Sequence, residues 1–556
     1  MKIDPNTAVV RRSLTRSLAG LLLSLAVTCL QAAAPRLEPQ GTAMRLIVQG
    51  EPMLVLGGEL GNSSASSEAY MAPHWARLRR MHLNTVLAPV SWELIEPSEG
   101  RFVWESVDAL IQGARANNLR LILLWFGAWK NSMSTYVPAW IKRDQTRFPR
   151  AELPSGQGTD ILSVFASATR NADARAFSAL MGHLKAVDEG RNTVLMVQVE
   201  NEVGMLPVAR EYTAVASERF REQVPEALLR ALAAHTDSGY EDVRQLWREH
   251  GSKTQGDWST VFGEGDAAAE VFSAWHYAQF IEAVVRAGKA VYPLPMYVNV
   301  ALNRMGRSPG EYPSGGPVPH LLEVWKAGAP SLDLLAPDIY FPSFVELATR
   351  YRRPDNPLFV PEANSAGQPE VPANAFYAFG KLDAIGFGPF AIESIDQQDP
   401  SPLAEAYAVL EQLAPAMLAS QGLSKMSGFK PRVLEDGTVI DLPVSETLGN
   451  YRFTVSFIDT QSSKTSQNTA AHGGLIIQTG PEEYLLAGRG LIVTFRPVGD
   501  GPPLAGIESA WEGTFDARGR WVPGRLLNGD QTHQGRHLRL APERFQIQRV
   551  RLYRYR

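Results

Sequence analysis

The sequence predicts an α/β protein in which a (β/α)8 TIM barrel is followed by an antiparallel β-sandwich domain. Eight short apolar segments between residues 52 and 393 are mostly separated by stretches with helical periodicity, an alternation typical of parallel βα units. After about residue 420, apolar and polar residues alternate with period two, as in antiparallel strands with one buried face. Several of the eight segments end in acidic or amide side chains, where barrels of this class carry their active sites.

Length and composition limit the classes of protein to consider. A chain of 556 residues with 45% hydrophobic and 20% charged residues is expected to fold as two or three globular domains. A net charge of -4 gives no basic surface for nucleic acid. No segment after the first 34 residues is long and apolar enough to cross a membrane. The sequence does not determine the oligomeric state.

Residues 1–34 have the pattern of a signal peptide. Arginines at positions 11, 12 and 16 precede an apolar stretch at 18–30 and a small-residue cleavage site at Ala32–Ala34. We therefore expect export to the periplasm or the exterior. Cys29 is the only cysteine, so the mature chain has no disulfide. Lipid anchoring through Cys29 is a minor alternative, because Val27 and Thr28 do not suit a lipidated cysteine.

The predicted elements follow in order along the chain. The helices are expected at residues 70–81, 107–116, 174–187 and 402–418, with an insertion at about 205–292 that contains helical stretches at 225–235 and 267–287. The barrel is expected to span residues 35–420 and the β-domain 421–556. An open doubly wound sheet is the alternative, but no glycine-rich phosphate turn follows an early strand. The eight strands are predicted at residues 52–58, 84–90, 119–126, 194–200, 295–300, 332–340, 357–362 and 385–393.

Two glutamates at strand ends form the candidate catalytic pair. Glu202 follows the fourth predicted strand and Glu362 ends the seventh. Glycoside hydrolysis requires two carboxyls that flank one bond: one protonates the leaving oxygen, and the other attacks the anomeric carbon if the gap is about 5 Å. The alternative is that each glutamate is an ordinary solvated charge at a strand end.

Aromatic and polar side chains gather at the same strand ends. Aromatic rings can stack on the apolar faces of sugars, and polar groups can bind the hydroxyls, although most tryptophans in any chain belong to the core. Glu200 has a second interpretation as a barrel-lining group, because strict alternation places it on the face of Glu202. Asp338 and Glu393 are weaker candidates, and structural roles are expected for both. The candidate substrate-binding residues are Asn201, Glu200, Glu59, Asn62, Trp125, Trp129, Asn131 and Tyr340.

Other chemistries lack their motifs. The ten histidines include no HExxH or similarly paired spacing, so no metal site is expected. The chain has no G-x-S-x-G turn and no P-loop. No cofactor is therefore expected, and the expected partner is a carbohydrate substrate.

The segment Gln198-Val-Glu-Asn-Glu202-Val-Gly204 resembles the fourth-strand motif of clan A retaining glycosidases, in particular the β-galactosidases of glycoside hydrolase family thirty-five. Trp92 with Glu96-Pro97, and Pro138-Ala-Trp140, resemble further family motifs. The resemblance implies that Glu202 is the acid/base, that Asn201 holds the sugar 2-hydroxyl and that Glu362, by position, is the nucleophile. Val203 and Pro89 stand where the family has tyrosines, which affects sugar specificity.

The expected function is therefore that of a retaining exo-β-galactosidase acting on terminal β-D-galactosyl residues, with side chains of xyloglucan oligosaccharides as one candidate substrate. Two alternatives stay open. One is a retaining β-glycosidase for another sugar, such as a β-glucosidase or β-mannosidase. The other is a non-catalytic carbohydrate-binding barrel.

Overall fold

The computed structural model of the chain describes residues 33–234, 242–395, 401–463 and 467–556. The predicted signal peptide, with Cys29, lies outside these residues except for its last two positions. Within them, no helix is long and apolar enough to cross a bilayer. All eight predicted barrel strands are present: β4 (Val55–Leu56), β5 (Thr85–Ser91), β6 (Arg120–Lys130), β9 (Val194–Asn201), β10 (Met296–Ala301), β11 (Leu334–Asp338), β12 (Phe359–Val360) and β13 (Gly386–Phe387).

The eight strands close into a ring. Five of them form a parallel sheet in the order β11-β10-β9-β6-β5, and the other three form a parallel sheet in the order β12-β13-β4. Parallel bridges join the two sheets at both junctions, between Glu59 and Leu87 and between Asp338 and Glu362. The chain therefore forms an α/β barrel, and the open-sheet alternative is excluded.

A small antiparallel sheet that the sequence analysis did not predict covers one end of the barrel. It consists of β1 (Arg36–Gln40), β2 (Ala43–Val48) and β3 (Glu51–Met53). Leu46 and Val48 of β2 join the hydrophobic cluster inside the barrel, which includes Val55 and Ile122 near the starts of their strands. Burial of these side chains keeps water out of the end of the barrel opposite the strand-end carboxylates.

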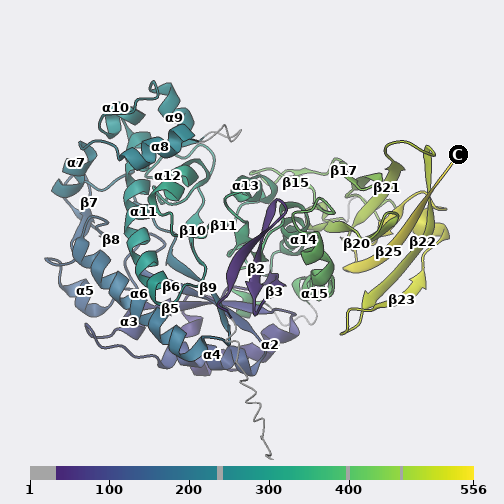
Figure 1. Cartoon of the computed structure of the whole chain (residues 1–556), viewed down its shortest axis with the longest axis horizontal. Coiled ribbons are helices and arrows are strands. Elements are labelled where there is room, and N and C mark those ends of the chain that lie inside the picture. The colour runs from purple at the N-terminus through teal and green to yellow at the C-terminus, as the bar shows by residue number, and fades with distance from the viewer. Residues whose placement is uncertain (1–32, 235–241, 396–400, 464–466) are drawn as a thin grey trace, which may run out of the picture. The chain divides into compact units, whose positions relative to one another are not determined.

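Helices surround the ring (Figure 1). The single helix predicted at residues 70–81 is two helices, because Pro73 lies between them and has no N–H to continue the helical hydrogen bonds. The helices that follow the strands in sequence, apart from those between β9 and β10, are α1 (Glu68–Met71), α2 (His74–Arg80), α3 (Trp92–Ile95), α4 (Glu105–Ala116), α5 (Ala139–Arg143), α6 (Ser167–Asp188), α12 (Leu322–Gly328), α13 (Phe344–Tyr351), α14 (Val371–Leu382) and α15 (Pro402–Ser420).

The segment between β9 and β10 is mainly helical, as predicted. Its long last helix packs along α6 and α12, so this helix belongs to the layer around the barrel. The shorter helices α8, α9 and α10 gather together at the top of the view in Figure 1. The five helices are α7 (Ala214–Phe220), α8 (Glu226–Ala234), α9 (Val243–Glu249), α10 (Trp258–Phe262) and α11 (Asp266–Val291).

The C-terminal region is antiparallel β-structure, as predicted. A six-stranded sheet has the order β14-β19-β20-β25-β22-β23, and a four-stranded sheet has the order β17-β18-β21-β24. Residues of both sheets share one hydrophobic cluster; their assignment as a sandwich stays a prediction. The strands are β14 (Met426–Phe429), β15 (Arg432–Val433), β16 (Val439–Ile440), β17 (Val444–Leu448), β18 (Tyr451–Ser456), β19 (Gly473–Gln478), β20 (Glu483–Arg489), β21 (Leu491–Pro497), β22 (Leu504–Phe515), β23 (Trp521–Leu526), β24 (Leu538–Leu540) and β25 (Gln546–Tyr555).

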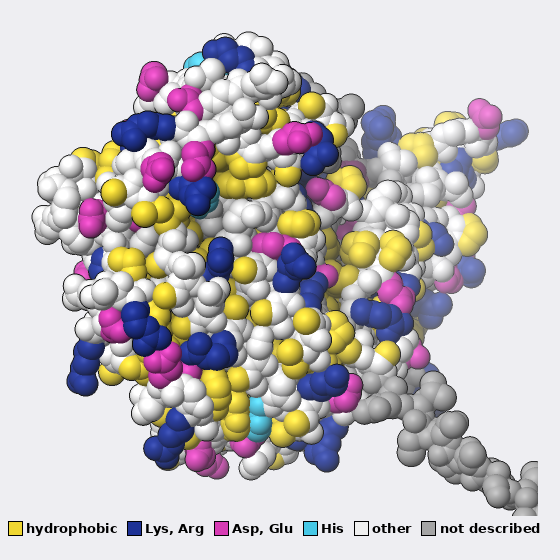
Figure 2. Space-filling model, turned by 60° about the vertical axis from the view of Figure 1, so that its left-hand side comes forward, with side chains coloured by type: hydrophobic (Ala, Val, Ile, Leu, Met, Phe, Trp, Pro, Cys, Tyr) yellow, Lys and Arg dark blue, Asp and Glu magenta, His cyan; other side chains and the backbone are white. Residues whose placement is uncertain are grey.

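The six-stranded sheet packs on the barrel through α14, which contacts β14 and β19. A Cβ on Gly380 of α14 would lie 2.8 Å from the Cα of Gly428 in β14, so the two backbones approach too closely for a side chain at either position. On the molecular face seen in Figure 2, acidic and basic side chains are interspersed, and the described residues form no broad basic patch there.

Candidate active site

Three carboxyl groups meet at the strand ends of the barrel. Glu202 follows β9, Asp338 ends β11 and Glu362 follows β12. One oxygen from each of the three lies within 4.8 Å of the others. All three side chains are buried, with Glu202 6% and Glu362 4% exposed. The structure thus brings together the two glutamates of the predicted pair, which are 160 residues apart in sequence (362 minus 202).

The backbone at the end of β9 decides where Glu202 points. Glu200 and Glu202 both have left-handed φ angles, 62° and 46°, and this breaks the alternation of a regular strand. The backbone N–H of Glu202 donates to Oδ1 of Asn299 on β10 over 3.0 Å. The amide of Asn131, itself at φ 49°, donates to Oε2 of Glu202. These two bonds fix the main chain and the carboxyl of Glu202.

Asn299 also connects Glu202 to Asp338. Its Nδ2 donates to Oδ2 of Asp338 over 2.7 Å, while its Oδ1 accepts from the Glu202 backbone. A single side chain on β10 therefore positions groups from the two neighbouring strands. The sequence analysis favoured a structural role for Asp338 and did not single out Asn299. Asp338 ends its strand as Glu202 and Glu362 do, so the same signal could have identified it.

A tyrosine hydroxyl holds one oxygen of Glu362. The hydroxyl of Tyr340, which is 37% exposed, donates to Oε2 over 2.6 Å. Oε1 is buried and, in the described part of the chain, accepts no hydrogen bond. Glu59, fully buried at the end of β4, adds a fourth carboxyl whose charge interacts with that of Glu362. Asn131, Tyr340 and Glu59 are thus predicted site residues that the structure places around the pair.

Burial and mutual repulsion raise the pKa values of this cluster. Burial, followed by the negative charge of Glu362, raises the pKa of Glu202 to about 7, against the opposing effect of Lys130. Burial is also the main cause that raises the pKa of Glu59 and of Asp338 well above the usual range. Carboxyls confined in a dry site cannot all ionise together, so the cluster retains protons at neutral pH.

Lys130 is buried beside the cluster, and its positive charge lowers the pKa values of Glu59, Glu202 and Asp338. Its Nζ donates to Oδ1 of Asn201 over 2.9 Å. Because an ammonium group can only donate, this contact fixes which end of the Asn201 amide is oxygen. The Nδ2 of Asn201 is buried and, within the described residues, has no protein acceptor. A donor is therefore available at the site for a ligand oxygen.

Three of the residues predicted to bind substrate do not lie beside the Glu202–Glu362 pair. Oε2 of Glu200 accepts from the backbone of Trp129 over 2.7 Å, and burial together with Asp173 of α6 raises the Glu200 pKa well above its usual range. Nε1 of Trp125 donates to the same Asp173 over 2.9 Å. Trp129 packs on Tyr277 and Phe280 of α11. The structure therefore places Glu200, Trp125 and Trp129 between the strands and the helices.

Asn62 lies on the loop after β4 and is half-buried. Its Oδ1 has no hydrogen-bond donor in the part of the chain that the structure describes. Tyr297 of β10, which the sequence analysis missed, is fully buried, and its pKa is raised by burial and then by the charges of Glu59, Asp338 and Glu362. Its position inside the barrel follows from the strand alternation that also directs Asn299 inward.

The spacing of Glu202, Asp338 and Glu362 also fits a set of cation ligands. Acidic groups at this spacing are common without an ion, and the sequence prediction that the protein has no metal site stays a prediction.

Comparison with known proteins gives partial matches. Residues 64–260 match the model of glycoside hydrolase family 42, described as beta-galactosidase, and residues 403–539 match a domain of unknown function, DUF5597. A beta-galactosidase from Xanthomonas manihotis is 28% identical over 218 residues, which cover 36% of this chain and 33% of the relative. The chain thus spans about a third of the length of that curated relative.

Two solved structures are among the similar folds. The beta-galactosidase from the psychrophilic Marinomonas ef1 has a TM-score of 0.44 at 13% identity, and the match covers 66% of this chain and 61% of that one. The beta-galactosidase from Rahnella sp. R3 has a TM-score of 0.44 at 16% identity, and the match covers 68% and 57%. Residues 64–260 are therefore similar to the glycoside-hydrolase domain of family 42 beta-galactosidases.

Proposed function

We propose that this protein is a retaining β-galactosidase that removes terminal β-D-galactosyl residues, with Glu202 as acid/base and Glu362 as nucleophile. The observation that carries the proposal is the distance of at most 4.8 Å between oxygens of the two carboxyls. Retaining glycosidases have carboxyls about 5 to 5.5 Å apart, whereas inverting enzymes need about 6.5 to 9.5 Å to admit a water molecule. The choice of galactose rests on the family match and the named relative.

The environments of the two carboxyls support different roles. Glu202 has a pKa of about 7, so near neutral pH a substantial fraction carries the proton that the leaving oxygen needs. Glu362 has one oxygen fixed by Tyr340 and the other without a partner in the described residues. The free Oε1 is suited to attack the anomeric carbon.

The reaction then proceeds in two displacements. Oε1 of Glu362 forms a bond to the anomeric carbon while the bond to the leaving oxygen breaks, and Glu202 transfers its proton to that oxygen. In the second step Glu202 removes a proton from water, and the oxygen of this water displaces Glu362 from the sugar. Asn201, whose Nδ2 faces no protein acceptor in the described residues, is proposed to donate to the sugar 2-hydroxyl.

We also propose the family, the natural substrate, the route of export and the domain boundaries. Placement in family thirty-five rests on the motif from Gln198 to Gly204 and on the shorter motifs at Trp92 and Pro138, while the matched model is that of family 42. Xyloglucan side chains are the proposed natural substrate. We also propose export by the signal at residues 1–34, a barrel over 35–420 and a β-sandwich over 421–556, supported by the sequence patterns described above.

The test uses an activated aryl β-galactoside and azide. We expect Glu362→Gly to lose activity and to form α-galactosyl azide when azide is added, because azide takes the place of the missing nucleophile. Glu202→Ala should instead give β-galactosyl azide, because azide attacks the covalent intermediate. Glu105→Gln, on the exposed start of α4, serves as the control and should retain full activity.

Product stereochemistry and sugar choice complete the test. Proton NMR of the first turnovers should show β-galactose before mutarotation. Release of α-galactose, or full activity of Glu362→Gly, would overturn the assigned mechanism. A panel of aryl galactoside, glucoside and mannoside tests the sugar, and a higher kcat/KM for glucoside or mannoside would overturn the galactosidase assignment.

A further inference from the structure

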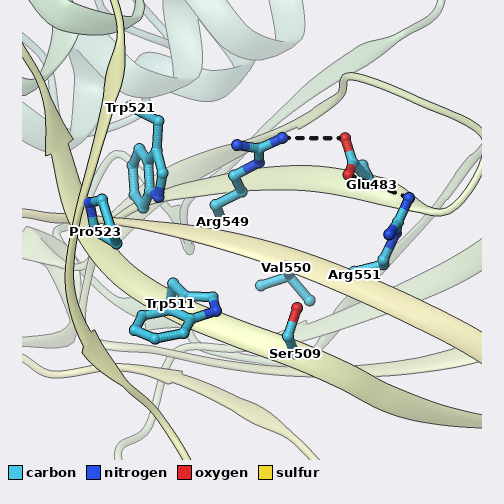
Figure 3. Close-up of a pocket in the computed structure, with 8 residues that line it drawn as sticks. All are labelled: Glu483, Ser509, Trp511, Trp521, Pro523, Arg549, Val550 and Arg551. Atoms are coloured by element: carbon cyan, nitrogen blue, oxygen red, sulfur yellow. Dashed lines mark hydrogen bonds and ion pairs between the residues drawn. The ribbon is translucent and has the colours of Figure 1, made fainter.

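A cavity separate from the barrel site lies in the C-terminal β-domain, on the six-stranded sheet. It has a volume of about 270 Å³, and Figure 3 shows the side chains around it. Its residues come from β20, β22, β23 and β25, none of which contributes to the barrel site. The side chains used below are Glu483, Trp511, Trp521, Pro523, Arg549 and Arg551.

Strand alternation explains why polar and aromatic groups meet there. On β25, Val550 and Leu552 point into the cluster shared by the two sheets, so Arg549 and Arg551 project from the opposite face. Trp511 of β22 pairs with Arg549 in the antiparallel register, which places the indole beside the guanidinium on that same face. The cavity is therefore built by the register of the sheet and does not depend on a loop.

One wall of the cavity is apolar. In Figure 3, Trp511 and Trp521 lie on the same side as Pro523. The ring of Trp521 covers Gly513, where an added Cβ would lie 2.6 Å from the indole. Trp521 is also held edge-on against Phe515, with ring centroids 5.2 Å apart. Trp511 and Trp521 are only partly buried, so part of their surface is available to a ligand.

The facing wall is polar and charged. Arg549 donates to Oε2 of Glu483 over 3.4 Å, and Arg551 lies 3.6 Å from the other oxygen. These contacts are long and solvent-exposed, so they contribute little to stability and are easily exchanged for contacts with a ligand. Two guanidinium groups and one carboxylate offer both donors and acceptors for hydroxyl groups.

This combination matches the chemistry of a sugar ring. A pyranose has apolar C–H faces that pack on aromatic rings, and hydroxyl groups around its edge that need donors and acceptors. We propose that the cavity binds a hexopyranosyl unit in the backbone of the polysaccharide whose galactosyl residues the barrel cleaves. The identity of that polysaccharide rests on the proposed function. Much of the cavity falls within the region that matches a domain of unknown function.

The experiment measures binding of the full chain by affinity electrophoresis. Glu362→Ala is used as the background so that the glycan is not consumed. The gels contain xyloglucan, galactomannan or pectic galactan, and a gel without glycan is the reference. We expect retardation by at least one of these polymers. Adding Trp511→Ala should weaken it about tenfold, because the ring loses its packing surface. Arg549→Ala should also weaken it.

Val522→Ala is the matched control, since Val522 is 47% exposed on the same strand as Trp521 but points to the other face. This control should be retarded like the parent. Trp521 packs partly on the barrel core and is less suitable for substitution. In the active background, Trp511→Ala and Arg549→Ala should hydrolyse the small aryl galactoside at the parental rate, which also shows that they fold.

The outcomes separate this inference from the proposed function. Retardation by none of the three polymers, or equal retardation of the parent, Trp511→Ala and Arg549→Ala, would overturn the binding cavity even if aryl galactoside is hydrolysed. Retardation that depends on Trp511, together with no hydrolysis of any galactoside, would support the cavity and overturn the function proposed for the barrel.

Discussion

Replacing Glu202 by glutamine should stabilise the protein above neutral pH while it abolishes activity. The substitution keeps the shape of the side chain and leaves an oxygen to accept the hydrogen bond from Asn131. It removes the group that must be ionised in a buried site beside Glu362. The active site therefore carries a cost in stability that the variant should reveal.

The size of this effect follows from the pKa of Glu202. Its pKa rises from the ordinary value of 4.5 to about 7 in the folded protein. Because the folded state binds the proton more tightly than the unfolded state, the folded state loses stability as the pH rises from 4.5 through 7. A pKa difference of about 2.5 corresponds to about 3 kcal/mol of unfolding free energy, lost almost completely by pH 8.

The assay is urea unfolding of parent and variant at pH 4.5 and pH 8, with midpoints converted through the m-value. We expect Glu202→Gln to gain about 3 kcal/mol over the parent at pH 8 and only a few tenths at pH 4.5. Glu51→Gln, an exposed carboxylate on β3, is the control and should show no such dependence. An equal difference at the two pH values, or a variant less stable than the parent at pH 8, would refute the reasoning.

Three further predictions concern groups around the site. Lys130→Met should move the basic limb of the kcat/KM profile to higher pH, because the Lys130 charge lowers the Glu202 pKa and its removal raises that pKa. Lys142→Met is the control and should leave the profile unchanged. A basic limb that does not move in Lys130→Met would contradict this prediction. Tyr340→Phe should lower kcat/KM at least about tenfold, since a hydrogen bond to a charged group is worth about 1.5 kcal/mol or more, and a parental rate would exclude a role for the 2.6 Å bond to Glu362. Gly127→Ala should lower the free energy of unfolding by about 1 to 3 kcal/mol, because its Cβ would lie 2.3 Å from the Trp125 indole and 2.5 Å from the Glu200 carboxyl; Gly367→Ala, with open space around it, should be neutral in the same thermal or urea unfolding experiment.

The sequence by itself determined the order and type of the barrel strands. Each is a short apolar run, and burial on both faces leaves few residue types that a parallel strand can use. The same local logic placed Glu202 and Glu362 directly after two of these runs, and the period-two pattern determined the antiparallel C-terminal strands. The sheet β1–β3 was missed because its three strands, residues 36–53, carry mixed polar and apolar residues without strict alternation.

Tertiary structure decided which polar groups share the site. Glu200 and Glu202 are two residues apart, yet the left-handed backbone at Glu200 turns its carboxyl to Asp173 and Trp129 while Glu202 joins Glu362. The left-handed φ angle of Glu200 could not be predicted from the periodicity of the sequence. Asp338 joined the cluster only because ring closure brings β11 beside β12. Distances between carboxyls, and the pKa values that depend on them, are properties of that closure and of the water it excludes.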